Sequence, residues 1–474
     1  MVDSYREIPV TKDSHPLIGA AKKCDFAKRG YVEEELFAYG RANVYKRGEK
    51  GVELRAENAP YINRILVRRP ADPRTASGRV VVEILNATSA VDIDRVWLQT
   101  KNLLMREGDA YIGITSKPSS IEVLKKFNPH RYEELSWKNP VDEYLPQFLI
   151  QQTINGGVID QSTETGLIWD MLTDCALDCK SGKLPLGGIS VKKVYLSGWS
   201  QSVGYVIRYV NDLAYKDGDT PYDGYLAFGG VRMHVPGLNQ YEIFSAAGET
   251  DTYIKKVTVP FIAVQTESEN GSLGNEKVRE PDSDEPDRLY RTYDIPGSTH
   301  DNYYNMSQYF VGDTDVHDSG RMTVYTGEEP IPNNYPYEFA FCAITKQMYD
   351  WAEKGIAAVR CKRIPVSAAG YNVRDRLGNA KGGWRLPPID VPVAVYVPHV
   401  HFIIPNPLGF QLYGCVKPFS EAQLKELYGD LANYERLVRE AARRSVQEAR
   451  LLPEDEEECI AFCLAEAEKY GLKG

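Results

Sequence analysis

The chain has 474 residues, 43% of them hydrophobic and 26% charged, which is the composition of a globular protein with a sizeable core. Its 66 acidic and 56 basic residues give a net charge of −10, which argues against nucleic acid or an anionic membrane as a partner. The N-terminal segment lacks a basic-then-apolar signal pattern, and no run approaches about 18 apolar residues. We therefore expect a soluble, cytoplasmic protein.

The first part of the chain predicts an antiparallel hairpin followed by a βαβ unit. Residues 31–70 alternate in the manner of paired strands. A continuous apolar strand at 78–86, an amphipathic helix at 95–108 and a buried strand at 109–116 come next. Parallel strands joined by a helix are therefore expected from residue 78 onward.

The middle of the chain continues this alternation. We predict helices at 165–182 and 202–218, and strands at 191–200, 222–230, 257–269 and 287–300. The order indicates an α/β fold with a mostly parallel central sheet and helices on both faces.

The last part of the chain is expected to add a helical extension. Residues 335–354 predict a helix, 362–418 are rich in proline and glycine, and the chain is helical from Ser420 onward. We expect a core at 1–359, which includes cap insertions at about 231–256 and 301–334, and a C-terminal extension at 360–474.

The eight cysteines are scattered and form no CxxC pair. Cys175 and Cys179, like Cys459 and Cys463, are four residues apart in helix-like runs without a neighbouring histidine. Buried, reduced thiols explain this pattern better than a metal site does, which agrees with an intracellular protein.

The segment Gly198-Trp199-Ser200-Gln201-Ser202 lies where a strand changes into a helix. It nearly matches the G-x-S-x-G nucleophile elbow, in which a sharp turn exposes the serine oxygen at the carboxyl edge of a sheet. Ser202 replaces the last glycine. The alternative is an ordinary strand-to-helix turn in which Ser200 caps the helix.

The order of the other polar residues favours the nucleophile interpretation. An α/β-hydrolase triad runs Ser, then Asp or Glu, then His. Here Glu267 and Glu269 follow the strand at 257, and His300 follows the last strand. We assign Ser200 as nucleophile, His300 as base and Glu269 as the orienting acid, with Glu267 as the alternative acid.

An oxyanion formed during acyl transfer needs two backbone N–H donors. One is expected from Gln201 and the other from the loop 87–90, where we single out Thr88 and Ser89. Substrate contacts are assigned to Trp199, Trp384 and Arg385.

The other six histidines fit the chemistry less well. His399 and His401 alternate as in a strand, and with no third ligand nearby we interpret them as structural or pocket-lining residues. Surface positions are expected for the remaining four, which are His15, His130, His234 and His317.

Over almost its entire length the chain resembles the bacterial alpha/beta hydrolase domain-containing proteins. The segments that carry the resemblance are GYVEEELFAYGRANVY, PYINRILVRRP, VVVEILN, GDAYIGITS with PHRYEEL, LSGWSQS, YDGYL, TESE, PGSTH and GNAKGGWRLPPIDVPVA. The family's elbow is close to GxSQSG, so Gln201 and Ser202 fit it, whereas Val203 stands where glycine is common. The resemblance implies serine hydrolase chemistry on esters.

The glycines of Gly378-Asn379-Ala380-Lys381-Gly382-Gly383-Trp384-Arg385 permit tight turns. Such turns could bring Trp384 and Arg385 to a pocket, where Arg385 would bind a substrate carboxylate. A structural turn with a surface arginine is the other interpretation.

These observations together predict an α/β-hydrolase fold with an N-terminal strand extension. The predicted function is hydrolysis of a small apolar or aromatic carboxylic ester through an acyl-enzyme, with no metal and no cofactor. An acyltransferase with the same triad, or a catalytically silent ligand-binding protein, are the alternatives. The sequence does not determine the oligomeric state.

Overall fold

The computed structural model describes residues 1–17, 24–88, 90–141, 160–230, 234–242, 245–246, 249–270, 279–304, 315, 330–399 and 413–474. The chain divides into two compact units. Unit 1 comprises Met1–Phe261, Glu285–Leu289 and Gln308–Val324, and unit 2 comprises Ile262–Asp284, Tyr290–Ser307 and Tyr325–Gly474. The boundary that we expected after residue 359 lies inside unit 2.

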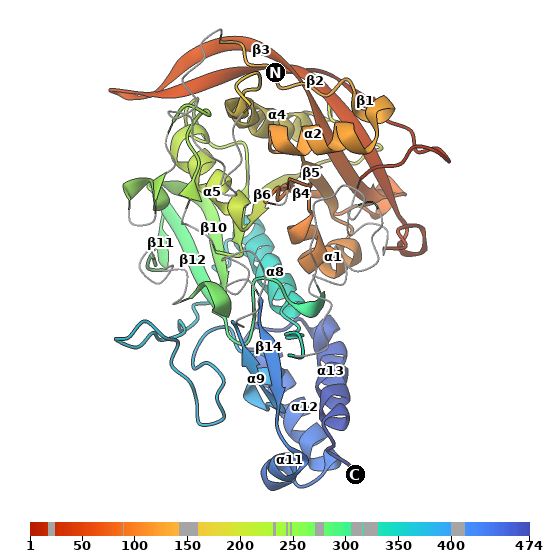
Figure 1. Ribbon diagram of the computed structural model, residues 1–474, viewed down its shortest axis with the longest axis vertical. Helices are drawn as coiled ribbons and strands as arrows, with labels where there is room; N and C mark the ends of the chain where they lie inside the picture. The colour runs from red at the N-terminus through yellow and green to blue at the C-terminus, as the bar shows by residue number, and fades with distance from the viewer. Residues whose placement is uncertain are drawn as a thin grey trace. The chain divides into compact units, whose positions relative to one another are not determined.

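The N-terminal hairpin of unit 1 is confirmed. β2 (Tyr31–Gly48) and β3 (Gly51–Pro70) are antiparallel, and their register runs from Tyr31 opposite Pro70 to Gly48 opposite Gly51 (Figure 1). A further strand that the sequence pattern did not reveal, β1 (Val2–Glu7), pairs with β2. The hairpin extends the sheet, because β3 also pairs antiparallel with β5 (Ala110–Ile114).

The centre of the sheet is parallel. β4 (Arg79–Ile84) lies between β5 and β6 (Lys193–Trp199), and β6 pairs with β7 (Gly224–Phe228). Nearly every residue of these four strands is buried. Since neighbouring side chains point to opposite faces of a strand, both faces of this part of the sheet are covered. The ten strands follow the order β1-β2-β3-β5-β4-β6-β7-β10-β12-β11, with β10 at Val257–Thr266, β11 at Ser283–Glu285 and β12 at Arg288–Ile295.

A buried carboxylate fixes the start of α1 (Arg95–Glu107) on this sheet. Glu83 of β4 accepts the N–H groups of Val96 and Trp97 at 2.9 and 3.0 Å and the Tyr111 hydroxyl at 2.8 Å. These two N–H groups have no acceptor within the helix, so Glu83 caps it. Burial raises the pKa of Glu83 to about 8, although the two N–H groups oppose the shift.

The remaining elements follow the predicted order. Unit 1 also contains α2 (Pro118–Phe127), α3 (Pro129–Tyr132), α4 (Ile168–Ser181), α5 (Gln201–Arg208), a π-helical turn (Tyr209–Leu213), β8 (His234–Val235) and β9 (Ser245–Ala246). Unit 2 contains α8 (Glu338–Lys354), α9 (Pro387–Asp390), β13 (Ala394–Val397), β14 (Cys415–Pro418), α11 (Glu421–Tyr428), α12 (Leu431–Gln447) and α13 (Glu456–Lys469) (Figure 1).

The helical C-terminal extension is confirmed. α12 contacts α13 and α9, and its buried residues Tyr434, Val438, Ala441 and Ser445 recur at helical spacing.

The expected caps are described only in part. Residues 234–242, 245–246 and 249–256 of the first are described, and they include the short β8–β9 pair; most of the second lies outside the described residues.

Two predicted strands end earlier than we expected. β10 stops at Thr266 rather than Glu269, and Glu267–Glu269 form a 3₁₀ turn. The Thr266 side chain and the Glu269 carboxylate form a reciprocal capping box, which favours helical over extended backbone. β12 stops at Ile295, because Pro296 lacks an N–H and Gly297 has a φ of 78°.

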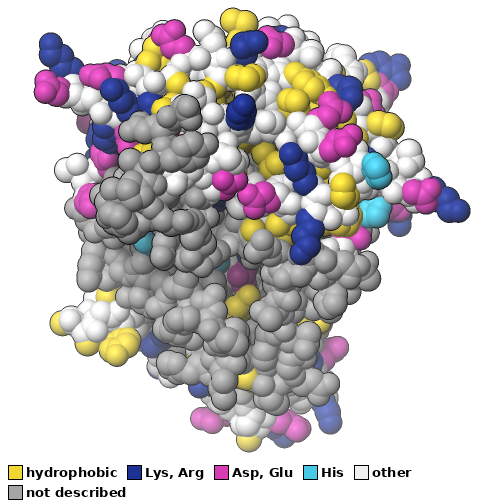
Figure 2. Space-filling view, turned by 45° about the horizontal axis from the view of Figure 1, so that its top comes forward, with side chains coloured by type: hydrophobic (Ala, Val, Ile, Leu, Met, Phe, Trp, Pro, Cys, Tyr) yellow, Lys and Arg dark blue, Asp and Glu magenta, His cyan; other side chains and the backbone are white. Residues whose placement is uncertain are grey.

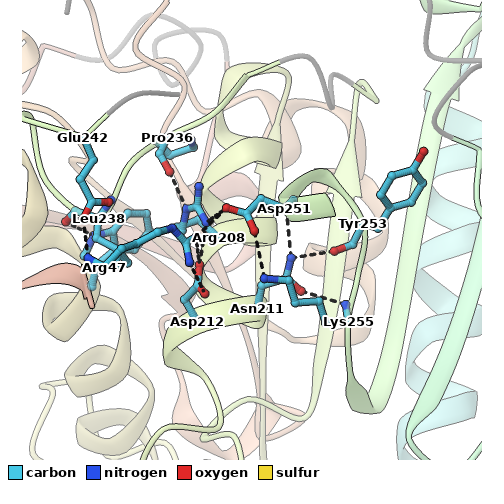
Figure 3. A network of polar contacts seen from close by, with 11 residues as sticks. Arg47, Arg208, Asn211, Asp212, Pro236, Leu238, Glu242, Asp251, Tyr253 and Lys255 are labelled. Atoms are coloured by element: carbon cyan, nitrogen blue, oxygen red, sulfur yellow. Dashed lines mark hydrogen bonds and ion pairs between the residues drawn. The ribbon is translucent and has the colours of Figure 1, made fainter. Parts of the chain in front are cut away.

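A charge network within unit 1 anchors the described part of the first cap (Figure 3). Arg47, at the end of β2, contacts Asp212 and Asp251 at 2.9 and 2.7 Å, and Arg208 contacts the same two carboxylates at 2.7 and 2.9 Å. Asn211 donates to the backbone carbonyl of Tyr253 at 2.7 Å. The segment 249–255 is thereby held against α5 and the hairpin.

The surface of the described residues carries mixed charge. In Figure 2, acidic and basic side chains are interspersed over the part of this face that is not grey. Within the described chain, no helix is both long and apolar enough to cross a bilayer.

All eight cysteines are thiols, and six of them are buried.

Candidate active site

Ser200 lies at a strained turn between β6 and α5. β6 ends at Trp199, α5 begins at Gln201, and Ser200 between them has φ 57° and ψ −117°. A non-glycine residue in such a conformation costs on the order of 1–3 kcal/mol and is characteristic of functional sites. The strand, the turn and the helix form the geometry of a nucleophile elbow.

Small residues around Ser200 allow this turn to form. A Cβ at Gly198 would lie 2.8 Å from the backbone oxygen of Ser202, so a side chain at this position would push strand and helix apart. A Cβ at Gly204 would lie 2.3 Å from the backbone oxygen of His234. The helix backbone therefore comes close to another segment at Gly204 and not at residue 203. Val203 stands where the family that the sequence resembles commonly has glycine, and it is buried in the core.

The predicted oxyanion donors differ in what they contact. Gln201 is the first residue of α5, so its N–H has no acceptor within the helix. The N–H of Thr88 donates to Asn86 Oδ1 at 3.1 Å. The Thr88 N–H is therefore already engaged, and Ser89 lies outside the described residues.

Asn86 connects the two expected halves of the oxyanion site, and the sequence did not single it out. Its Nδ2 donates to the backbone oxygen of Trp199 at 2.9 Å, while its Oδ1 accepts from Thr88. Asn86 is buried, two residues after the end of β4. Its position just past the carboxyl end of a parallel strand was the signal that could have identified it.

Unit 2 holds the predicted acid and histidine together. Glu269 Oε1 lies 2.5 Å from His300 Nδ1, and both side chains are buried. The N–H and the hydroxyl of Thr266 donate to the same carboxylate at 2.7 and 2.9 Å. A carboxylate on Nδ1 directs the other ring nitrogen, Nε2, toward proton transfer.

Glu267 points elsewhere and has different partners. It accepts the N–H of Gly297 at 2.6 Å and pairs with Arg374 at 2.5 Å. Burial raises the pKa of Glu267, and the positive charge of Arg374 opposes that shift. Glu267 therefore supports the backbone of the loop that carries His300, whereas Glu269 contacts the imidazole itself.

Two serines fasten the 3₁₀ turn to the histidine loop. The N–H of His300 donates to Ser268 Oγ at 2.9 Å. The N–H of Glu267 donates to Ser298 Oγ at 3.1 Å, and Ser298 Oγ donates to the Ile295 carbonyl at 2.6 Å. Hydrogen bonds from most polar residues of the segments 266–269 and 296–300 therefore hold the 3₁₀ turn against the loop that carries His300.

The predicted substrate residues are engaged in structural contacts. Trp199 is fully buried, and its ring fills the space beside Gly229. Trp384 is fully buried, packs on Tyr293 and donates to the Arg450 carbonyl at 2.9 Å. These contacts do not support a substrate role for either tryptophan.

Arg385 is also held by structural contacts. Its guanidinium bonds to Asp390 and to the carbonyls of Ala380 and Ile389. The backbone around Gly382 and Gly383 passes so close to neighbouring carbonyls that a Cβ would lie 2.3 and 2.6 Å from them. These contacts favour the interpretation of this segment as a structural turn.

The remaining histidines have separate surroundings. His15 and His130 are exposed as expected, with His15 paired to Asp315 at 2.9 Å. His234 is half-buried in β8, and burial lowers its pKa. His399 follows β13, whereas His317 and His401 lie outside the described residues. Among the described residues, no cluster of three or more potential metal ligands is found.

Comparisons with known proteins identify the family. A family model described as "Alpha/beta hydrolase domain" matches residues 4–461. No curated protein matches the sequence significantly. Among solved structures, dienelactone hydrolase from Anabaena variabilis is 12% identical with a TM-score of 0.28, over 60% of this chain and 94% of that one. Esterase B from Lactobacillus rhamnosis is 12% identical with a TM-score of 0.30, over 71% and 95%. Because the family match spans nearly the whole sequence, the chain belongs to the alpha/beta hydrolase domain family.

Proposed function

We propose that this protein is a serine hydrolase that cleaves the carboxylic ester of a small substrate with an apolar or aromatic part. The observation that carries the proposal is the backbone of Ser200, which has φ 57° between a parallel strand and a helix. This backbone conformation is energetically unfavourable, and it is expected where a turn exposes a catalytic side chain to the substrate. The family membership and the Glu269–His300 pair support the same conclusion.

In the proposed mechanism, Ser200 Oγ attacks the ester carbonyl carbon while His300 Nε2 accepts the hydroxyl proton. Glu269 holds the imidazole through Nδ1 and stabilises the imidazolium that forms. The oxyanion accepts the N–H of Gln201 and a second N–H from the loop 87–90. The tetrahedral intermediate then expels the alcohol, which takes the proton from His300.

Water releases the acid in the second half of the reaction. His300 removes a proton from the water as it attacks the acyl carbon, and Ser200 leaves with that proton. An acyltransferase would differ only in using another alcohol or an amine in place of water. A silent ligand-binding protein would have no use for a buried carboxylate fixed on an imidazole, so the Glu269–His300 pair favours an enzyme.

The proposal extends to location and partners. The eight free thiols support a reducing compartment, which we propose to be the cytoplasm. A small ester, and not a nucleic acid or a membrane, is the proposed partner of a chain whose net charge is −10.

The first test is hydrolysis of a short activated ester by the purified protein and by Ser200→Ala. We expect the substitution to lower kcat by several orders of magnitude without changing the unfolding midpoint. Ser202→Ala is the matched control, because Ser202 lies in the same turn and its hydroxyl donates only a long bond of 3.4 Å to the Leu85 carbonyl. Parental activity in Ser200→Ala would disprove the assignment of the nucleophile.

A further inference from the structure

Lys117 lies at the same sheet edge as Ser200. Ile114 of β5 and Gly198 of β6 both pair with Ile84 of β4, and all three strands are parallel. Lys117 follows Ile114 by three residues, and Ser200 follows Gly198 by two. The chain segments that leave these strands therefore emerge side by side at the carboxyl edge of the sheet.

Hydrogen bonds fix the two segments against each other. The Ser116 hydroxyl donates to the Leu85 carbonyl at 2.9 Å, whereas the Ser202 hydroxyl makes only a long bond of 3.4 Å to the same oxygen. The Lys117 ammonium donates to Oε1 of Gln201, the residue that follows the nucleophile. It also lies 5.2 Å from the centre of the Tyr205 ring, one turn further along α5. The positive charge is thus held beside the elbow.

The ammonium lacks the anionic partner that a desolvated charge requires. Burial lowers the pKa of Lys117 to about 7, although the negative charge of Asp92 opposes the shift. Asp92 is engaged by Arg64 and by the Thr115 hydroxyl. Among the described residues, no carboxylate lies within ion-pair distance of Lys117 Nζ. Its main partners are a neutral carboxamide and an aromatic face, which leave N–H groups of the ammonium available.

We propose that Lys117 binds a carboxylate carried by the substrate, so that the preferred ester has an anionic group a few bonds from its scissile carbonyl. The inference rests on the proposed function and narrows its substrate class to esters such as the monoesters of short dicarboxylic acids. A carboxylate would supply the missing acceptor in a charge-assisted hydrogen bond. Gln201 acts as a positioning residue, because its side chain holds the ammonium while its N–H belongs to the oxyanion site.

The experiment compares two esters of equal length, monoethyl succinate and ethyl levulinate, which replaces the carboxylate by a neutral ketone. We expect the parent protein to prefer the succinate in kcat/KM. Lys117→Met should lower the ratio of the two kcat/KM values by about 10- to 100-fold, as expected for loss of a hydrogen bond between charged groups. Lys117→Arg, which keeps a cation, should retain most of the preference.

Two controls separate this effect from damage to the fold. Lys126→Met removes an exposed positive charge from α2, the helix that Lys117 directly precedes, and should leave the ratio unchanged. Unfolding midpoints of the Lys117 variants should match the parent, because removing a poorly paired, desolvated charge does not destabilise. Should Lys117→Met nevertheless fail to fold, Lys117→Gln replaces it with the same expected loss of preference.

The outcomes distinguish the inference from the proposed function. Equal kcat/KM for the two esters in the parent, or a ratio that Lys117→Met does not change, would overturn the role of Lys117 and leave the hydrolase intact. A parent protein that cleaves neither ester and is not labelled by a fluorophosphonate would overturn the hydrolase function, and the inference with it.

Discussion

Glu267 and Glu269 show how two identical side chains in one turn acquire different partners. In an extended strand they would point to the same side, since residues two apart share a face. The 3₁₀ turn separates them instead. Glu269 contacts the imidazole of His300, and Glu267 contacts the backbone of Gly297 and the side chain of Arg374.

The first prediction compares Glu269→Gln with Glu267→Gln. An amide cannot stabilise the imidazolium or keep the tautomer, so Glu269→Gln should lower kcat on the order of 10⁴-fold with little loss of stability. Glu267→Gln breaks a buried ion pair with Arg374 and should destabilise the protein by about 1–3 kcal/mol while lowering kcat less than about tenfold. Steady-state kinetics and urea unfolding measure both effects.

Each variant serves as the matched control of the other. A larger loss of kcat at Glu267 than at Glu269 would reverse the assignment of the acid. Near-parental activity of both variants would show that the orienting carboxylate comes from another part of the chain.

The sequence singled out residues that belong to a known motif and did not single out Asn86 or Lys117. Ser200, Glu269 and His300 were assigned from the elbow motif and from chain order, which depend on residue type and spacing. Asn86 and Lys117 belong to no motif, and they follow strands whose register brings the ends of β4, β5 and β6 to one level. Trp384 and Arg385 were singled out by composition, whereas their contacts are structural.

At the scale of elements, the network around Asp251 ties the described residues 249–255 of the first cap to the rest of unit 1 (Figure 3). Asp251 pairs with Arg47, Arg208 and Lys255 at 2.7, 2.9 and 2.9 Å. Burial alone would raise the pKa of Asp251, but the hydrogen bonds from Lys255 and Arg208 and the charge of Arg47 hold it well below its usual range. The network therefore stabilises the folded state when Asp251 is ionised.

We predict that Asp251→Asn lowers the free energy of unfolding by about 2 kcal/mol at pH 7, because Arg47 and Arg208 lose one of their two carboxylates. The pKa of Asp251 is lower in the folded than in the unfolded protein. Its contribution to stability is therefore fully present above the unfolded-state pKa of about 4 and is lost as the pH falls toward the folded-state pKa. The difference between parent and variant should be constant from about pH 5 to 8 and shrink below about pH 4.

Urea unfolding over this pH range measures the difference, with Asp217→Asn as the control. Asp217 is 86% exposed and pairs with its neighbour Lys216 at 3.0 Å, so its loss should change stability by less than about 0.5 kcal/mol. An Asp251→Asn protein as stable as the parent at pH 7 would show that the network contributes nothing to the anchoring of the cap.

Elements were predicted well where periodicity defines them and less well at their ends. The hairpin and the C-terminal helices have patterns of period 2 or 3.6, and the central strands are continuous apolar runs. The end of β10 depends on a capping box between Thr266 and Glu269, and the end of α5 on a π-helical turn at Tyr209–Leu213. Such local hydrogen bonding leaves no periodic signal. β1 was missed because five of its six residues are not buried, so it lacks an apolar pattern.

At the scale of the whole molecule, the predicted site residues fall in two compact units. The elbow, Asn86 and Lys117 belong to unit 1, whereas Glu269 and His300 belong to unit 2. The family match, which spans both units, agrees with a single hydrolase rather than two independent proteins.

The most direct test of this account is covalent labelling by a fluorophosphonate, with the modified residue mapped by mass spectrometry. The reagent reacts with a serine only when a base has activated its hydroxyl. We predict one adduct on the parent protein, located on Ser200, no adduct on Ser200→Ala, and strongly slowed labelling of His300→Ala. A parent protein that stays unlabelled, or carries the adduct on another residue, would contradict the assignment of Ser200 as the nucleophile of a serine hydrolase.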